Sequence, residues 1–181
     1  MASKKFNALT QIDKHTVGNL VSSHQYIQDI PYGAVALEDV DNFHIVELSF
    51  EDGERSFKYL TDVANEQFLV AAVERRLLNP MLNEGIIEYY NGKGERARII
   101  RLKKGLIFDT SAFDATAVAA TGIEKGNKCH YDPATKKFLI HDGTHADFAT
   151  ADKQFQVLSD EDNLEYTLGA PMVRLEVIKG E

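Results

Sequence analysis

The stretch Tyr89–Phe113, YYNGKGERARIIRLKKGLIFDTSAF, reads as strand, tight turn, strand, turn, strand. Apolar residues alternate with polar ones, as expected for half-buried strands, and the breaks contain the glycine and asparagine that tight turns favour. The same pattern returns in GNKCHYDPATKKFLI, residues 126–140, where a turn at Asp132–Thr135 separates two alternating runs. Neither stretch places a group of residues for chemistry, so both are interpreted as scaffold.

Further strands are predicted on both sides of this region. Phe43–Phe50 and Ser56–Leu60 alternate around an Asp52-Gly53 pair. This pair favours a type I′ hairpin because both central residues of that turn need positive φ. Near the C-terminus, Val173–Val177 alternates and predicts a last strand, with these residues inward: Val173, Leu175 and Val177.

Two other segments are expected to be strands. Ile30–Leu37 opens with Pro31, which confines its start to a sheet edge. Gln67–Val73 is a short apolar run, interpreted as a buried strand followed by one or two helical turns over Glu74–Leu78. Together the signals predict a mainly β protein, a sandwich or barrel of short antiparallel strands with an extended N-terminal arm and little helix.

The predicted organisation is an arm over residues 1–26 and a β-rich domain over residues 27–181, with a possible sub-boundary within residues 112–121. The arm is polar with separated apolar positions, and a frayed terminus is the alternative interpretation. Three of its residues could bury against a partner subunit: Phe6, Leu20 and Tyr26.

Composition excludes several classes of protein. A chain of 181 residues suits one domain, and its net charge of -8 repels a polyanion, so nucleic-acid binding is not expected. The single cysteine, Cys129, cannot form an intramolecular disulfide, which fits synthesis in a reducing cytosol. No long apolar run or signal peptide is recognised, so no membrane partner is expected.

Candidate chemical sites are weak. His141–Asp147 holds two imidazoles and two carboxylates, but a loop fixes no ligand geometry, so no metal is expected. Cys129 and His130 are neighbours in a predicted strand and point to opposite faces, which prevents a dyad. Asp160–Asn163 lacks the glycine and distal glutamate of a calcium loop. Asn91–Glu95 is glycine-rich, but it is interpreted as a hairpin turn and not as a phosphate-binding loop. We therefore expect no catalytic residues, no cofactor and no enzyme activity.

Charge is segregated along the chain. Residues 27–54 carry eight acidic side chains and no Lys or Arg, whereas residues 91–104 carry six basic side chains and one acidic one. These two blocks either neighbour each other in the fold or dock between copies or onto a partner lattice. If the blocks dock onto another molecule, four basic residues are the expected contacts: Arg96, Arg98, Arg101 and Lys103. In a strand, Arg96 and Arg98 share one face, whereas Arg101 and Lys103 share the other.

Three segments carry a resemblance to a known family: EYYNGKGERARIIRLKKGLIFDTSAF, KGNKCHYDPATKKFLI and GAPMVRLEVIK. The residue patterns of these segments and their order along the chain resemble those of structural proteins of tailed bacteriophage virions. The resemblance is to capsid decoration (head-stabilising or cement) proteins in particular. This resemblance implies a β-rich module that binds the outside of an assembled capsid at junctions between major capsid protein subunits. It also implies frequent trimers, no catalysis and no cofactor.

The expected function is thus that of a non-enzymatic virion protein on the capsid surface, with the major capsid protein as partner and a homo-oligomer, such as a trimer, as its assembled form. One alternative is another virion component, such as a tail-tube, head-completion or fibre-attachment protein. A second alternative is a non-viral ligand-binding β-barrel or an unrecognised hydrolase, which a concave polar pocket would favour.

Overall fold

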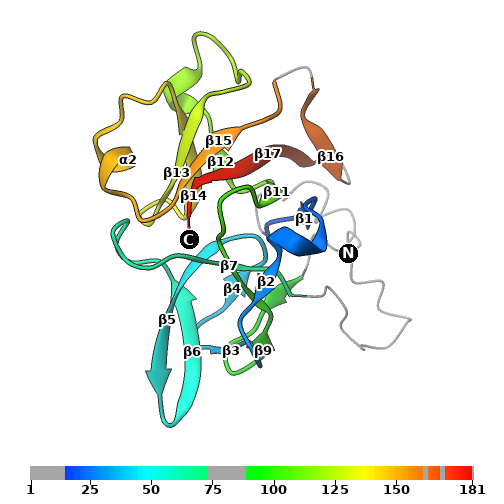
Figure 1. Cartoon of the computed structure of the whole chain (residues 1–181), viewed down its shortest axis with the longest axis vertical. Coiled ribbons are helices and arrows are strands. Elements are labelled where there is room, and N and C mark those ends of the chain that lie inside the picture. Colours follow the sequence, from blue (N-terminus) through cyan, green and yellow to red (C-terminus); the bar gives the residue numbers. More distant parts are fainter. Residues whose placement is uncertain (1–14, 73–88, 161–162, 168–169, 181) are drawn as a thin grey trace, which may run out of the picture.

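The computed structural model describes residues 15–72, 89–160, 163–167 and 170–180. Two β-sheets contain most of the strands of the described chain, and short helices connect some of these strands (Figure 1). The prediction of a mainly β protein with little helix is confirmed. Both sheets stay open, so the barrel alternative is wrong.

The first sheet is mostly antiparallel. In spatial order its strands are β2 (Gln28–Asp29), β10 (Ile99–Arg101), β7 (Phe68–Val70), β5 (Ile45–Glu51), β6 (Glu54–Tyr59), β3 (Ala34–Ala36) and β9 (Arg96–Ala97). Strand β3 pairs parallel with β6, and a separate two-stranded sheet lies alongside, formed by β4 (Val40–Asp41) and β8 (Tyr90–Asn91).

The second sheet joins strands from both ends of the described chain. In spatial order they are β1 (Gly18–Leu20), β11 (Ile107–Thr110), β17 (Ala170–Lys179), β15 (Gln154–Val157), β13 (Lys128–Asp132), β14 (Lys137–His141) and β12 (Phe113–Asp114), with β16 (Glu165–Thr167) paired to β17. The described helices are η2 (His24–Tyr26), η5 (Thr116–Val118) and α2 (Ala146–Thr150). None of the described helices is long and apolar enough to cross a membrane.

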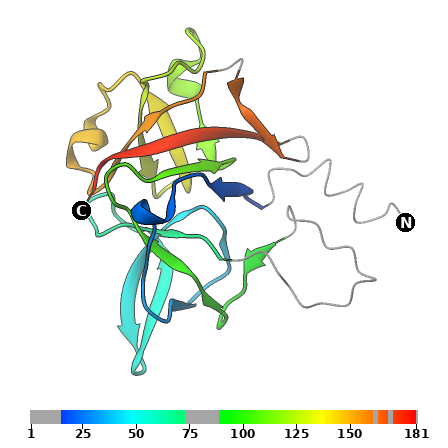
Figure 2. The ribbon, with the colours of Figure 1, turned by 45° about the vertical axis from the view of Figure 1, so that its right-hand side comes forward.

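One hydrophobic core joins the two sheets, which lie above one another in Figure 2. Ile45 and Leu69 of the first sheet belong to the same buried cluster as Phe108, Phe138 and Phe155 of the second. Their chain neighbours on the first sheet point to its other face and form a second cluster, as strand alternation requires. The predicted inward residues of the last strand are completely buried: Val173, Leu175 and Val177.

Two of the predicted hairpins form. Strands β5 and β6 pair from Val46↔Tyr59 to Glu51↔Glu54, and Asp52 and Gly53 at the turn have φ of 50° and 81°. These positive values are what a type I′ turn needs. Strands β13 and β14 pair antiparallel around the turn that follows Asp132.

Two local predictions are wrong. The strand predicted over Ile30–Leu37 is limited to β3, which lies between β6 and β9 rather than at an edge. Asn91–Glu95 forms a turn but no hairpin, because β8 pairs with β4 whereas β9 pairs with β3. The possible sub-boundary within residues 112–121 stays a prediction. This segment contains β12 and η5, and β12 pairs with β14 in the second sheet.

The predicted arm is only partly separate from the fold. Val17 is buried, and β1 pairs along its whole length with β11. This part of the predicted arm therefore packs within its own chain. The strand expected over Gln67–Val73 is confirmed as β7. The helical turns expected over Glu74–Leu78 and the first arm anchor, Phe6, lie outside the described residues.

Candidate functional sites

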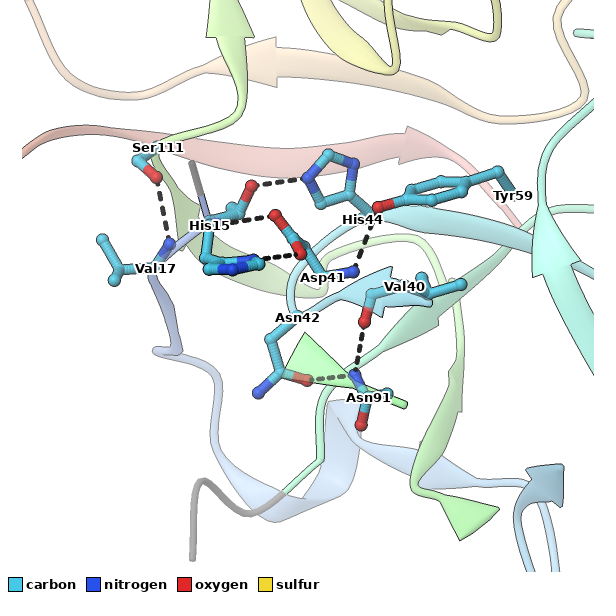
Figure 3. A network of polar contacts seen from close by, with 10 residues as sticks. His15, Val17, Val40, Asp41, Asn42, His44, Tyr59, Asn91 and Ser111 are labelled. Carbon is cyan, nitrogen blue, oxygen red and sulfur yellow. Dashed lines mark hydrogen bonds and ion pairs between the residues drawn. The ribbon is translucent and has the colours of Figure 1, made fainter. Parts of the chain in front are cut away.

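A network of polar side chains lies between the two sheets (Figure 3). The His44 ring Nε2 contacts the Thr16 hydroxyl, and its Nδ1 lies 2.9 Å from the Tyr131 hydroxyl. Burial, together with the charge of Lys136, lowers the pKa of His44 to about 3. His44 is therefore neutral at physiological pH and links both sheets by hydrogen bonds.

Asp41 organises the other half of this network. Its Oδ1 lies 2.8 Å from His15 Nδ1, its Oδ2 accepts the Thr16 N–H, and its own N–H donates to the Tyr59 hydroxyl at 3.0 Å. Burial raises the pKa of the Tyr59 phenol, which therefore stays protonated. These bonds hold residues 15–16 against β4, and β4 against β6 of the first sheet.

A cavity of about 340 Å³ opens beside the network, and His15, Asp41 and Ser111 line it. A histidine oriented by a carboxylate is one part of a nucleophilic site. The Ser111 hydroxyl, however, accepts the Val17 N–H at 3.0 Å and points toward Val17 in Figure 3, while the His15 ring faces Asp41. The observed bonds fasten residues 15–17 to the rest of the fold.

A second cluster combines histidines of two segments. His130 on β13 and His141 on β14 are 1% and 2% exposed, and His130 Nδ1 lies 3.1 Å from His141 Nε2. His145 and Asp147 follow β14 and approach His130, so that these three residues have potential ligand atoms within 4.8 Å of one another. The sequence pattern indicated His141–Asp147 but missed His130, because only the β13–β14 register brings it to this segment.

Cys129 is buried in the core between the two sheets. Its thiol contacts the backbone oxygen of His130 at 3.8 Å, and burial raises the pKa of the thiol well above its ordinary value. A protonated, inaccessible thiol is a poor nucleophile.

Two arginines of the predicted basic block, residues 91–104, are paired within the chain. Arg98 makes two hydrogen bonds to Asp29, at 2.8 and 3.2 Å, and Arg96 lies 3.2 Å from Glu54. The acidic block, residues 27–54, and the basic block, residues 91–104, are thus neighbours in the fold. This was one of the two arrangements expected from the sequence. A role for these arginines in docking stays a prediction.

The remaining interface candidates lie in different surroundings. Arg101 is 3.7 Å from Glu66, and its guanidinium lies over the Phe68 ring. Leu20 packs against the main core. Lys103 is half-buried, and Tyr26 is 38% exposed.

An exposed aromatic pair was missed by sequence reasoning. Tyr32 is 92% exposed and Phe50 is 75% exposed. Arg55, which is the cross-strand partner of Phe50, donates to the Pro31 oxygen at 3.1 Å, and Arg96 donates to the Tyr32 oxygen at 3.0 Å. These contacts connect four residues, which together we name the tip surface: Tyr32, Phe50, Arg55 and Arg96.

Comparison with known proteins gives the chain a family. Residues 11–178 match the model of the YonC prophage protein family. The chain belongs to the YonC prophage protein family. It is also 40% identical to the SPbeta prophage-derived uncharacterized protein YonC of Bacillus subtilis (strain 168), in an alignment that covers 99% of both chains.

Membership of the YonC family gives this protein a phage origin. The expected relation to bacteriophages is therefore confirmed, and the alternative of a non-viral ligand-binding barrel is wrong. The matched range of this YonC-family protein includes both side-chain networks and the whole tip surface.

Proposed function

We propose that this YonC-family protein is a non-enzymatic structural component of the phage particle that binds the outer surface of the assembled capsid and stabilises it. Its partner is the major capsid protein, and it acts as a homo-oligomer, such as a trimer, on the virion. Its phage origin and its mainly β scaffold support this role. The observation that carries the proposal is the exposed aromatic residue Tyr32.

Tyr32 is unfavourable in its position for the isolated protein. The Gly33 N–H donates to the Ile30 oxygen at 2.9 Å, so Pro31 and Tyr32 are the central residues of a β-turn. Tyr32 has a φ of 62°, at a turn position where glycine or asparagine is preferred. A large side chain that is both strained and 92% exposed gains little within its own chain, which supports a function in contact with another molecule.

The chemistry around Tyr32 suits a protein partner. Phe50 adds a second exposed aromatic ring, and Arg55 and Arg96 carry the positive charges of the tip surface. Tyrosine and arginine are enriched among residues that contribute most to protein–protein binding. The two arginines also hold the turn through backbone oxygens, which limits the entropy lost when a partner binds.

The test uses capsids that lack this protein, to which purified protein is added before the particles are sedimented. We expect Tyr32→Asn with Phe50→Ser to abolish co-sedimentation while the purified double variant remains folded. Val21→Ser is the matched control, because Val21 is another exposed apolar residue but lies outside the tip surface. Binding led by apolar contacts should also persist as salt is raised, since salt mainly screens exposed charges.

A second variant tests the other candidate surface. If Tyr26→Ser prevents co-sedimentation and the tip variant does not, the docking surface includes the N-terminal segment and not the tip. If the wild-type protein sediments with isolated tails and not with heads, the capsid assignment is overturned in favour of a tail component. Hydrolytic turnover of a substrate dependent on His15 would overturn the non-enzymatic role.

A further inference from the structure

We propose that His130, His145 and Asp147 form a binding site for a divalent transition-metal ion, with Zn²⁺ as the preferred ion. The site is independent of the proposed attachment to the capsid. It lies where β13 of the second sheet meets the start of α2 (Figure 1).

The distances are close to those of a bound ion. The potential ligand atoms of the three residues lie within 4.8 Å of one another. Ligands about 2.0–2.2 Å from a tetrahedral zinc ion are separated by roughly 3.3 Å. His145 and Asp147 have partly exposed side chains, so they can close this difference by rotating while the buried His130 stays in place.

The donor set favours a transition metal over calcium or magnesium. Two imidazoles and one carboxylate suit Zn²⁺ and its neighbours, whereas Ca²⁺ and Mg²⁺ need oxygen ligands. The rings of His130 and His145 lie close together, with centroids 4.7 Å apart. A water molecule would complete the coordination.

Hydrogen bonds identify the free nitrogen of His130. The Gly143 N–H donates to His141 Nδ1 at 2.9 Å, so His141 carries its proton on Nε2 and donates it to His130 Nδ1. His130 therefore carries its own proton on Nε2, and we assign this nitrogen as the ligand. Ligation moves that proton to Nδ1, and the bond reverses so that His130 donates to His141 Nε2.

The same shift has a consequence at His141. Once Nε2 accepts from His130, the His141 proton is on Nδ1, and the Gly143 N–H loses its acceptor. Gly143 lies in a loop with a φ of 102°, where its N–H can turn toward water. In this arrangement His141 orients the ligand His130, as second residues behind metal-binding histidines commonly do.

The experiment is a calorimetric titration of the tag-free full chain with Zn²⁺, with Ca²⁺ and Mg²⁺ titrated in parallel. We expect one Zn²⁺ per chain, a rise in Tm on binding, and no binding of Ca²⁺ or Mg²⁺. His145→Ala and Asp147→Asn should each weaken Zn²⁺ binding about tenfold or more. His24→Ala removes an exposed histidine of η2 and Asp142→Asn removes a carboxylate of the same loop, and both controls should bind Zn²⁺ like the wild type.

Nitrogen NMR of the histidine rings provides a second readout. Zn²⁺ should move the proton of both His130 and His141 from Nε2 to Nδ1. The proposal is overturned if the wild type does not bind Zn²⁺, or if His145→Ala and Asp147→Asn bind it as tightly as the two controls. Unchanged tautomers in the zinc-bound protein would overturn the assignment of Nε2 as the ligand.

Discussion

His44 of the first sheet's lobe is hydrogen-bonded to Tyr131 of the second sheet, with 2.9 Å between Nδ1 and the phenol oxygen. The pair is buried, and the Thr16 hydroxyl contacts the other ring nitrogen of His44. One neutral imidazole thus joins the N-terminal segment and both sheets. Protonating it would place a charge in the centre of the molecule.

We therefore predict that stability falls in acid through His44. Its pKa is about 3 in the fold and 6.5 in the unfolded chain, so between these values the unfolded state binds the extra proton. Stability is full above pH 6.5 and is lost as the pH falls toward 3, by up to about 1.4 kcal/mol per pH unit for this group. Urea unfolding of the wild type and of His44→Gln between about pH 6 and pH 4 should give a shallower slope for the variant.

The residual slope of the variant is also informative. Burial lowers the pKa of His141 to about 4, and His130 is shifted in the same direction, so both contribute in the variant and in the wild type. Identical slopes for the two proteins would show that His44 does not titrate as described.

Substitution of Gly18 should separate the N-terminal strand from the fold. A Cβ at this position would lie 2.3 Å from Phe43 Cγ and 2.4 Å from the Asp109 oxygen, closer than packed atoms tolerate. We expect Gly18→Ala to lower the free energy of unfolding by about 1–3 kcal/mol, as overpacking does. Asn19→Ala, at the exposed neighbouring position, is the control and should change it by less than about 0.5 kcal/mol.

Hydrogen exchange distinguishes a local effect from a global one. In Gly18→Ala the amides of β1 and their partners on β11 should lose protection first. Unchanged protection there would mean that β1 contributes nothing to the stability of the second sheet.

The cross-strand pair Asp109–Arg174 should contribute more to the free energy of unfolding than an ordinary surface ion pair does. The Asp109 side chain is 3% exposed, and Arg174 reaches both of its oxygens, at 2.8 and 3.1 Å. Arg174→Leu leaves a buried carboxylate without its charged partner, and we expect a loss of about 3 kcal/mol. Adding Asp109→Asn to Arg174→Leu should recover part of this loss in chemical denaturation, and a double variant weaker than the single one would contradict the role of the buried charge.

Tyr32→Asn should stabilise the isolated protein although it removes a large side chain. Asparagine tolerates the φ of 62° better than tyrosine does, and the lost ring is 92% exposed. We expect a gain of about 0.5–1 kcal/mol in the free energy of unfolding. Tyr32→Phe is the control and should leave stability unchanged, whereas a loss of stability in Tyr32→Asn would show that the ring is packed within its own chain.

Local patterns were sufficient for two hairpins, β5–β6 and β13–β14, and for the last strand. Asp52-Gly53 predicts its own turn type because the required positive φ values depend on those two residues alone. Alternation likewise identified Val173, Leu175 and Val177 as inward. Such features follow from the backbone and from neighbours in sequence.

Features that depend on distant pairing could not be predicted in this way. Leu20 was interpreted as an arm residue because its partner strand begins at Ile107, far along the chain. His130 was separated from His145 for the same reason, since only the register of β13 against β14 brings the cluster together. The exposure of Tyr32 was also hidden, although its place between Pro31 and Gly33 was a signal for a turn.

Strand β17 is the last strand in chain order and yet lies within the second sheet, between β11 and β15. During synthesis on the ribosome, β11 and β15 are made first, and these two strands are not neighbours in the sheet. The sheet can therefore be completed only after residues 170–179 have left the ribosome. A chain cut short before this strand would expose two unpaired strand edges, so proteases and chaperones of the host can distinguish it from the full-length protein.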